Sequence, residues 1–577
     1  MCGGAGDGSS RAPFSRRGFL LTAAASLAVG SQAVVRIPAA AADLPGFPAG
    51  VDVYRSGYRN WVGDITAVGL WACAPRDGDE AVAVVNWAHR QGWTVRGRGS
   101  SHGWSPLTVP EGVAAGAPVL LVDTATHLTG LALESTGPAA VRAGTGVTLE
   151  AFLGFLEGHG LGVTACPAPG DLPLGGALAV DAHGTAVPAL GEQRLPGHTY
   201  GSLSNLVVSL TAVVWDAEAD AYVLRTFRRE DPEGAVLLAH LGRALVTEVV
   251  LRAGANTNLR CVSRVDVPVG ELFAAPGSDG RTFASFLDES GRAEAIWFAF
   301  TDHPWLKVWS VAPRRPLLSR HVTSPYNYPF SDNVPTLVAD LVGRIASGAA
   351  WYLAPVLGNA QLDAAVLGLT ATLSSDIWGP SKNTLLYLKP TTLRETANGY
   401  AVLTSRGQVQ RVVHEFTRFY RERLDAYAAR GRFPVNGQVE IRVTGLDDPA
   451  DVGVTGALAP SLSALRPRPD RPEWDTAVWL DILTLPGTPY APEFYREVER
   501  FLLDTYDGGD ALARVEWSKG WAYTDNAAWS DAEVIGTAVP ASFGDSAGPS
   551  WDRAAAGLER LDPHRVFDNP FLSRLFP

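Results

Sequence analysis

The stretch "RGRGSSHGWSP", residues 96–106, places a single histidine, His102, inside a glycine-rich loop. Glycine and serine gather where a backbone passes close to a phosphate group, because small side chains leave successive N–H groups accessible. The spacing G-x-G-x-x-H imitates a dinucleotide-binding loop, but histidine replaces the third small residue. Pro106 and Pro110 also prevent the helix that such a loop must open. The stretch therefore predicts another kind of phosphate-binding loop, with an imidazole at its centre.

Three further segments rich in small residues follow that loop, each beside a strand-like run. They are "AGTGVT" (143–148), "PAPGDLPLGGALAVDAHGTA" (167–186) and "GHTYGSLSNLVVSLTAVVWD" (197–216). A single segment of this kind is ordinarily a turn. Four in succession predict one long phosphate-bearing ligand that lies across several loops.

A second candidate group lies in "VEIRV", residues 439–443. Side chains alternate along a strand, so Glu440 and Arg442 share one face. Burying such a pair costs several kcal/mol per ion before mutual attraction offsets it, which favours a functional use. Glu440 can accept a proton, and Arg442 can stabilise a negative charge that develops beside it. A solvated ion pair at a sheet edge is the structural alternative.

Glu294, in "EAIWFAF", is the second acid–base candidate. It shares its strand face with Ile296, Phe298 and Phe300. Because apolar surroundings disfavour a charged carboxylate, we expect the pKa of Glu294 to be raised.

Two other short motifs resemble those of hydrolases, but the residues around them do not have the spacing that those enzymes require. "GDSAG", residues 544–548, has the pattern of a serine-hydrolase turn, but Pro549 follows at once and too little chain remains for that fold. His414 and Glu415 are not followed by a second histidine at the spacing of zinc proteases. Neither a metal site nor a disulfide framework is predicted, because three widely spaced cysteines follow residue 42: Cys73, Cys166 and Cys261.

Alternating helical and strand-like segments must position these residues. Apolar spacing predicts helices over 77–91 and 407–431. Strands are predicted where apolar runs are bounded by glycine, proline or aspartate: 92–97, 118–124, 139–146, 204–216, 244–254, 294–302, 436–445 and 477–485. The pattern indicates an α+β chain in which one domain covers 43–260, completed by 516–577, and a second covers 261–515.

The chain has 577 residues, enough for two domains and a sizeable core. Its net charge of −12 argues against nucleic acid or an anionic membrane surface as partner. "SRRGFL" (15–20) precedes an apolar run and a small-residue cleavage site near Ala42. Paired arginines in this context are typical of a twin-arginine export signal, so we expect residues 1–42 to be removed and the protein to be secreted. A membrane anchor is the alternative.

The order of the motifs resembles a known family. "GRGSSHGWSP", "AGTG", "LGGALAVDAHGTA", "YGSLSNLV" and "ALVTEVVL" are similar to the FAD-binding domain of the vanillyl-alcohol oxidase family, which is of the PCMH type. "EAIWFAFTDHPWLKVW", "NGQVEIRVTG" and "EWSKGWAYTD" resemble its cholesterol oxidase branch with covalently bound FAD. The resemblance implies a two-domain flavoenzyme whose substrate domain contains a large, mostly antiparallel sheet covered by helices.

The resemblance also implies roles for single residues. His102 would bond covalently to the flavin, while Gly99, Ser100, Ser101 and Gly103 would hold the pyrophosphate. Lys519 would place a cation near the flavin pyrimidine ring, and Asp481 would face that ring. Further cofactor contacts would come from the later motifs: Gly175, Gly176, His183, Gly184, Gly201, Ser202, Ser204, Asn205 and Val246.

Cys166 leaves one question open. In some relatives a cysteine before the second glycine-rich loop makes a second covalent flavin bond, and a small buried cysteine is the alternative.

The implied activity is that of a secreted sterol oxidase. Hydride would pass from sterol C3 to FAD, O₂ would become H₂O₂, and a carboxylate would move the Δ5 double bond to Δ4. Glu440 would take the hydroxyl proton, and Arg442 would stabilise the oxygen charge. An aldonolactone or sugar-alcohol oxidase and a non-catalytic sterol-binding protein are the alternatives. We expect a monomer that contacts a membrane transiently to extract its sterol.

Overall fold

The computed structural model describes residues 37–38, 44–328, 330, 336–348, 350–544 and 551–577. The predicted export signal lies outside the described residues except for Ile37 and Pro38, and Ser546 of "GDSAG" also lies outside them. Within the described ranges, no helix combines the length and the apolar character needed to cross a membrane.

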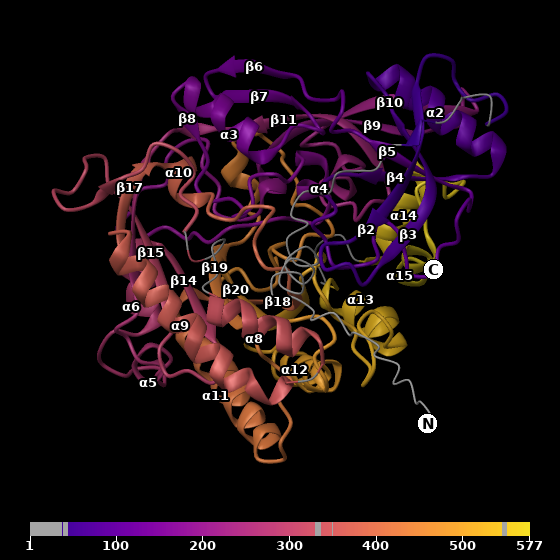
Figure 1. Cartoon of the computed structure of the whole chain (residues 1–577). Helices are drawn as coiled ribbons and strands as arrows, with labels where there is room; N and C mark the ends of the chain where they lie inside the picture. Colours follow the sequence, from indigo (N-terminus) through magenta and orange to yellow (C-terminus); the bar gives the residue numbers. More distant parts are fainter. Residues whose placement is uncertain (1–36, 39–43, 329, 331–335, 349, 545–550) are drawn as a thin grey trace, which may run out of the picture.

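The first part of the chain forms two five-stranded sheets, drawn in indigo and purple in Figure 1. The order of one sheet is β1 (Ile37–Pro38), β2 (Asp52–Arg59), β3 (Thr66–Ala74), β5 (Val119–Asp123) and β4 (Thr94–Arg98). The other is antiparallel, in the order β10 (Ala221–Arg228), β9 (Val207–Asp216), β11 (Leu245–Arg252), β7 (Ala139–Gly144) and β6 (Leu131–Thr136). A short pair, β8 (Leu161–Gly162) and β12 (Gly254–Ala255), lies beside them.

Helix α2 (Gly78–Gln91) joins these two sheets. It begins where the side chain of Asp77 accepts a hydrogen bond from the N–H of Glu80, and it ends at Gly92 with a φ of 68°. Its apolar stripe packs on β4, β9 and β10. The predicted helix over 77–91 is therefore confirmed. Two shorter helices, α3 (Leu149–Gly158) and α4 (Leu174–Ala179), follow β7.

The second part of the chain forms a nine-stranded sheet. Its order is β16 (Arg320–His321), β17 (Asp376–Pro380), β13 (Asn258–Arg264), β15 (Trp305–Val311), β14 (Arg292–Phe298), β19 (Gln438–Gly445), β20 (Thr476–Thr484), β18 (Thr396–Thr404) and β21 (Leu512–Val515). Only the β16–β17 pair is parallel. The predicted large, mostly antiparallel sheet is confirmed. It begins at Asn258, three residues before the predicted domain boundary at 261.

Helices cover this sheet on the side away from the first part (Figure 1). Helix α11 (Val409–Ala428) buries one face, including Val413, Phe416 and Tyr420, and contacts β20. The other helices of this part are α5 (Val269–Leu272), α6 (Phe283–Ser290), α8 (Thr336–Ala346), α9 (Ala354–Ala371), α10 (Ser381–Leu385) and α12 (Ala491–Thr505).

The C-terminal helices return to the first part of the chain. They are α14 (Trp551–Leu561), which contacts β9, and α15 (Pro570–Leu575), whereas the preceding helix α13 (Val539–Ser542) contacts β21 of the large sheet. The hydroxyl of Tyr222 on β10 donates to Asp562 at 2.5 Å, and Asn569 donates its side-chain N–H to the carbonyls of Pro106 and Leu107. These contacts fix the segment that follows His102, so the tail supports the loop in which the sequence predicts cofactor binding.

The two parts meet along the face of the nine-stranded sheet that is opposite its covering helices. The hydroxyl oxygen of Thr185 lies within hydrogen-bond distance of the carbonyl oxygens of Ala293 on β14 and Val443 on β19, at 2.9 and 3.1 Å. These bonds place residues 182–187 of the first part directly over the two strands that carry Glu294, Glu440 and Arg442.

Candidate active site

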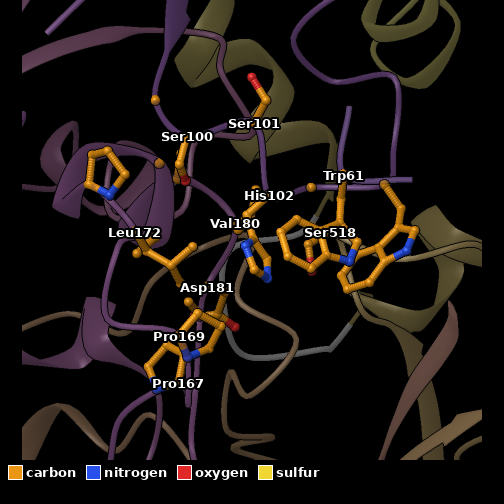
Figure 2. A pocket seen from close by; sticks show the side chains of 18 of the residues that line it. Trp61, Ser100, Ser101, His102, Pro167, Pro169, Leu172, Val180, Asp181 and Ser518 are labelled. Carbon is orange, nitrogen blue, oxygen red and sulfur yellow. The ribbon is translucent and has the colours of Figure 1, made fainter. Parts of the chain in front are cut away.

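A cavity of about 370 Å³ lies between the two parts. Its walls include the 97–105 loop, residues 175–177 and 179–185, the start of β11, and the central strands of the large sheet. Figure 2 shows the His102 region of this cavity, with Trp61, Leu172, Val180 and Asp181 around it.

The loop around His102 has free backbone donors on the cavity wall. Among the described residues, no oxygen accepts a hydrogen bond from the backbone N–H of Ser100, Ser101, His102 or Gly103. Ser101 has a φ of 55°, which turns the chain at this point. The N–H groups of Trp104 and Ser105 both bind the carbonyl of Ser518 and anchor the loop. Successive unpaired N–H groups of this kind bind anions, so the loop fits a phosphate-bearing cofactor.

His102 stacks on Trp61, with ring centroids 3.8 Å apart and an angle of 29° between the rings. Burial lowers the pKa of His102 to about 3, with smaller effects from Arg394 and Lys519, so the imidazole is neutral. Its buried Nδ1 has no hydrogen-bond partner among the described residues. A neutral, orphaned ring nitrogen beside a row of anion-binding N–H groups fits a residue whose partner is the cofactor.

Most of the other predicted cofactor residues also line the cavity: Gly99, Gly175, Gly176, His183, Gly184 and Val246. At Gly184 a Cβ would lie 2.6 Å from the carbonyl oxygen of Cys166, so glycine is needed where these two segments of the backbone approach each other closely. At Gly176 no atom lies within 4 Å of the place that a Cβ would take, which leaves room for a ligand. His183 stacks on Trp479 at 3.5 Å.

Four predicted cofactor residues do not line the cavity: Gly201, Ser202, Ser204 and Asn205. The backbone N–H and the hydroxyl of Ser202 donate to the two oxygens of Asp447, and Asn205 donates to the carbonyl of Asp448. At Gly201 a Cβ would lie 2.1 Å from Asp447 Oδ1. The "YGSLSN" motif thus joins the two parts of the chain through Ser202 and Asn205, while the hydroxyl of Ser204 donates to the carbonyl of Leu178 within the first part.

Charged side chains from four neighbouring strands, β15, β14, β19 and β20, converge on one face of the large sheet. In the strand register Lys307 lies opposite Glu294, and Glu294 lies opposite Arg442. In the next row Glu440 lies opposite Asp481. The structure therefore brings together all the residues for which the sequence predicts catalytic roles on β14, β19 and β20.

Arg442 is the centre of this cluster. Its Nε donates to Glu294 at 2.7 Å, its Nη1 donates to Asp481 at 2.7 Å, and its Nη2 donates to Glu440. Burial lowers the pKa of Arg442, but Glu440, Glu294 and Asp481 outweigh burial and raise it well above its usual value. The guanidinium is therefore a permanent cation.

The expectation that the pKa of Glu294 is raised is wrong. Burial alone does raise it, but the cations of Arg442 and Lys307 outweigh burial and lower the pKa. The hydroxyl of Tyr387 also donates to Glu294 at 2.6 Å. Glu294 is thus an anion whose oxygens are occupied by donors, because the tertiary structure adds cations that its own strand does not reveal.

Asp481 and Lys519 form the second half of the cluster. Lys519 lines the cavity and contacts Asp481 and Glu516, the latter at 3.2 Å. Asp481 is fully buried and does not line the cavity. Burial and the charge of Glu516 raise the pKa of Asp481 to about 7, despite the opposing effects of Lys519 and Arg442. Burial lowers the pKa of Lys519, but Asp481 and Glu516 outweigh it and keep the ammonium charged.

Sequence reasoning missed four residues of the site: Lys307, Tyr387, Glu395 and Glu516. Lys307 is fully buried, 3.5 Å from Glu294, and its Nζ lies 2.9 Å from the ring centroid of Tyr387. The alternation in "WLKVW" could have identified it as an inward-facing lysine. No local pattern marks Tyr387 or Glu395, because loops that precede β18 bring them to the cavity.

Cys166 lines the cavity as a buried thiol. Burial raises the pKa of Cys166 to about 12, so the sulfur is not an activated thiolate. The protonated thiol favours the alternative in which Cys166 is a small buried side chain over the one in which it makes a second covalent bond to the flavin. In the described part of the chain, no group of three or more His, Cys, Asp or Glu side chains could hold a metal ion.

Comparisons with known proteins agree with this geometry. A family model described as "FAD binding domain" matches residues 71–219, and one described as "Cholesterol oxidase, substrate-binding" matches residues 258–577. The structure of a "Solvent-stable cholesterol oxidase" is 56% identical, with a TM-score of 0.91, and the match covers 92% of this chain and 99% of that one. Cholesterol oxidase from B. sterolicum is 47% identical, with a TM-score of 0.90 and the same coverages. The comparison with curated proteins gives no match.

The fold, the anion-binding loop and the charged cavity define an FAD-dependent oxidoreductase that acts on CH–OH groups. The chain belongs to the cholesterol oxidase family. The predicted family and the predicted two-domain fold are both confirmed.

The raised pKa of Asp481 leads to a testable pH dependence. The folded-state pKa, about 7, lies above the value of about 3.9 for an unfolded aspartate, so the folded protein holds an extra proton between these values. The contribution of Asp481 to the free energy of unfolding therefore falls as the pH rises from about 3.9 to about 7. Asp481→Asn cannot lose a proton, so we expect its unfolding temperature, relative to wild type, to be higher at pH 8 than at pH 5.

Differential scanning fluorimetry at the two pH values measures this difference. Asp504→Asn, a change at an exposed position of α12, is the matched control and should show no such trend. An Asp481→Asn difference that is equal at both pH values would contradict the assignment.

Proposed function

We propose that this protein is a sterol oxidase that converts a 3β-hydroxyl to a ketone and then moves the Δ5 double bond to Δ4. The observation that best supports this proposal is the composition of the cavity wall. Charged side chains of the large sheet line one part of the cavity, and apolar side chains line the part beside it: Leu385, Leu388, Leu393 and Leu483. An apolar ligand with one reactive polar end suits such a cavity. Bound FAD would supply the acceptor for the hydride that leaves the alcohol carbon, and O₂ would take up the two electrons and become H₂O₂.

Glu440 is the residue best placed to accept the hydroxyl proton. It lines the cavity, and its side chain retains 16% exposure, whereas that of Glu294 retains 1%. The oxygens of Glu294 already receive bonds from Arg442 and Tyr387. A base must reach its substrate, so the geometry supports Glu440 over Glu294.

Arg442 and Lys519 serve as the fixed cations of the site. Arg442 holds Glu440 in place and stabilises negative charge on the substrate oxygen. Lys519 contacts Asp481 and supplies positive charge to the part of the cavity that Glu516 and Ser518 also line.

A test of these roles is flavin reduction without O₂. Arg442→Ala should slow anaerobic reduction by cholesterol about 10²–10³-fold, the usual loss when one charge-stabilising donor is removed. Glu440→Gln should slow it comparably, because the amide keeps the shape but accepts no proton. Cholesterol binding should weaken much less, because surface burial holds an apolar ligand.

Stopped-flow absorbance of the flavin measures this step separately from reoxidation. Arg430→Ala, at an exposed position after α11, is the matched control. If both active-site variants reduce the flavin at wild-type rates, the pair is structural. If wild type is reduced by sugar alcohols rather than by cholesterol, the sterol proposal itself fails.

The covalent attachment of FAD through His102 is also proposed. It is supported by the neutral imidazole, the orphaned Nδ1 and the adjacent free N–H groups. A neutral ring nitrogen has the lone pair that a covalent bond to the flavin requires, and stacking on Trp61 fixes its direction.

We expect yellow colour to stay with acid-precipitated wild-type protein and to be released from His102→Ala. The absorbance of the supernatant near 450 nm measures the released flavin. His127→Ala, in the loop between β5 and β6, is the control and should retain its colour. Free release of flavin from wild type would show that the bond does not exist.

Membrane contact, a monomeric state and secretion complete the proposal. Eight of the twelve exposed large apolar side chains among the described residues lie between 311 and 373: Val311, Leu317, Leu318, Leu337, Tyr352, Val356, Leu367 and Leu373. Helices α8 and α9, which carry several of them, pack on Leu393 of the cavity wall. An apolar surface next to a sterol cavity suits contact with the bilayer in which sterols dissolve. Export rests on the paired arginines of the N-terminal segment.

Replacing Leu317, Leu318 and Leu367 by serine should reduce sedimentation with phosphatidylcholine–cholesterol vesicles several-fold. Activity on cholesterol dispersed in detergent should not change, because these side chains do not line the cavity. The control is Leu190→Ser, which removes an apolar side chain that is 70% exposed on the other part of the chain. Equal binding by the triple variant and wild type would locate the membrane contact elsewhere.

A further inference from the structure

Glu395 is a buried carboxyl group that the mechanism above does not use. It immediately precedes β18 and lines the cavity together with Gln438 and Glu440. Its exposure is 6%, and no cation among the described residues forms an ion pair with it. A carboxylate in such a place lacks the partner that buried charges need, which favours the neutral acid.

The contacts of Glu395 hold it beside the proposed base. The side-chain Nε2 of Gln438 donates to Glu395 Oε2 at 3.1 Å, and the same nitrogen lies 3.4 Å from Glu440 Oε1. At Gly437 a Cβ would lie 2.3 Å from Glu395 Oε1, so glycine there leaves room for the carboxyl group. The indole N–H of Trp104 donates to the backbone carbonyl of Glu395 at 2.7 Å.

The electrostatic surroundings keep the proton on Glu395. The titratable groups that face it are Glu440 on β19 and Tyr495 on α12, and neither is a cation. Burial is the main cause that raises the pKa of Glu395 to about 8, and the charge of Glu440 adds to it, while the bond from Gln438 opposes it. One amide therefore separates an acid that keeps its proton from the carboxylate that acts as the base.

We propose that Glu395 is a catalytic residue of the isomerisation, donating a hydrogen bond to the substrate oxygen at C3 while Glu440 moves the proton. The inference rests on the proposed sterol reaction. Glu440 returns to its carboxylate form when the hydroxyl proton leaves with the peroxide, as the overall reaction of alcohol and O₂ to ketone and H₂O₂ requires.

The proton transfer then balances without an oxidant. Glu440 removes a proton from C4 of the 3-keto-Δ5 steroid; the C4–H bond breaks and its electrons form the dienolate, with negative charge on the C3 oxygen. Glu440 returns the proton to C6 and the product is the Δ4 ketone. Glu395 keeps its own proton throughout, and its hydrogen bond strengthens as the oxygen becomes negative.

The test measures isomerisation separately from oxidation. Holoenzyme is given cholest-5-en-3-one, and the conjugated product is followed by its ultraviolet absorbance. Glu395→Leu should lower the isomerisation rate constant about 10²–10³-fold, whereas anaerobic flavin reduction by cholesterol should fall far less. Glu395→Gln keeps an N–H donor and should retain most of the activity.

The pH profile distinguishes a hydrogen-bond donor from a structural group. Wild-type isomerisation should fall as the pH rises through about 8, because an ionised Glu395 cannot donate and repels the dienolate. Glu395→Gln should lose this alkaline limb. Glu473→Gln, at an exposed position, is the control and should keep it.

Two outcomes would overturn the inference. One is normal isomerisation by Glu395→Leu; the other is an alkaline limb that persists in Glu395→Gln. Both can occur while wild type still oxidises cholesterol, so failure of the inference is distinguishable from failure of the proposed function, in which wild type would not oxidise cholesterol at all.

Discussion

The buried guanidinium of Arg442 is the interaction on which the rest of the site depends. Three carboxyl groups from three strands meet on this one cation, and for Glu440 it is the only cation in contact among the described residues. Removing one partner from such a buried cluster leaves uncompensated charge, which costs more than the pair contributes when intact. The register of β14, β19 and β20 is therefore tied to the charge balance, because a slip of one residue would turn Arg442 to the opposite face.

The cluster also gives carboxyl side chains that lie close together different protonation states. Glu294 is held as an anion by Arg442 and Lys307, while Asp481 and Glu395 have raised pKa values because burial and neighbouring carboxylates dominate. Environments that push the pKa values of neighbouring acids apart provide both a base and a proton donor in one cavity. The sheet supplies these environments, and the loop with Lys519 completes them from the C-terminal part of the chain.

A second group of buried polar side chains, away from the Arg442 cluster, joins the two parts of the chain by hydrogen bonds. Ser463 lies 2.6 Å from oxygens of both Asp181 and Asp447, and a hydroxyl has one proton to donate. Asp447 already accepts two bonds from Ser202, so Asp181 carries the shared proton; burial and the charge of Asp447 raise its pKa well above the usual value. Ser202 and Asn205 of the "YGSLSN" motif, which resembles a cofactor motif, therefore make contacts between the two parts.

The sequence by itself determined which residues could do chemistry and on which elements they lie. Strand alternation placed Glu440 and Arg442 on one face, glycine and serine around His102 indicated an anion-binding loop, and the order of the motifs predicted the family and the large antiparallel sheet. These properties are local, or repeat with the period of a strand or helix. Only the tertiary structure decided the charge state of Glu294, the presence of Lys307 and Glu395 in the site, and the use of Ser202 and Asn205 as contacts between the parts. The reason is physical: a pKa or a hydrogen bond depends on groups within a few ångströms in space, and here those groups come from parts of the chain far apart in sequence.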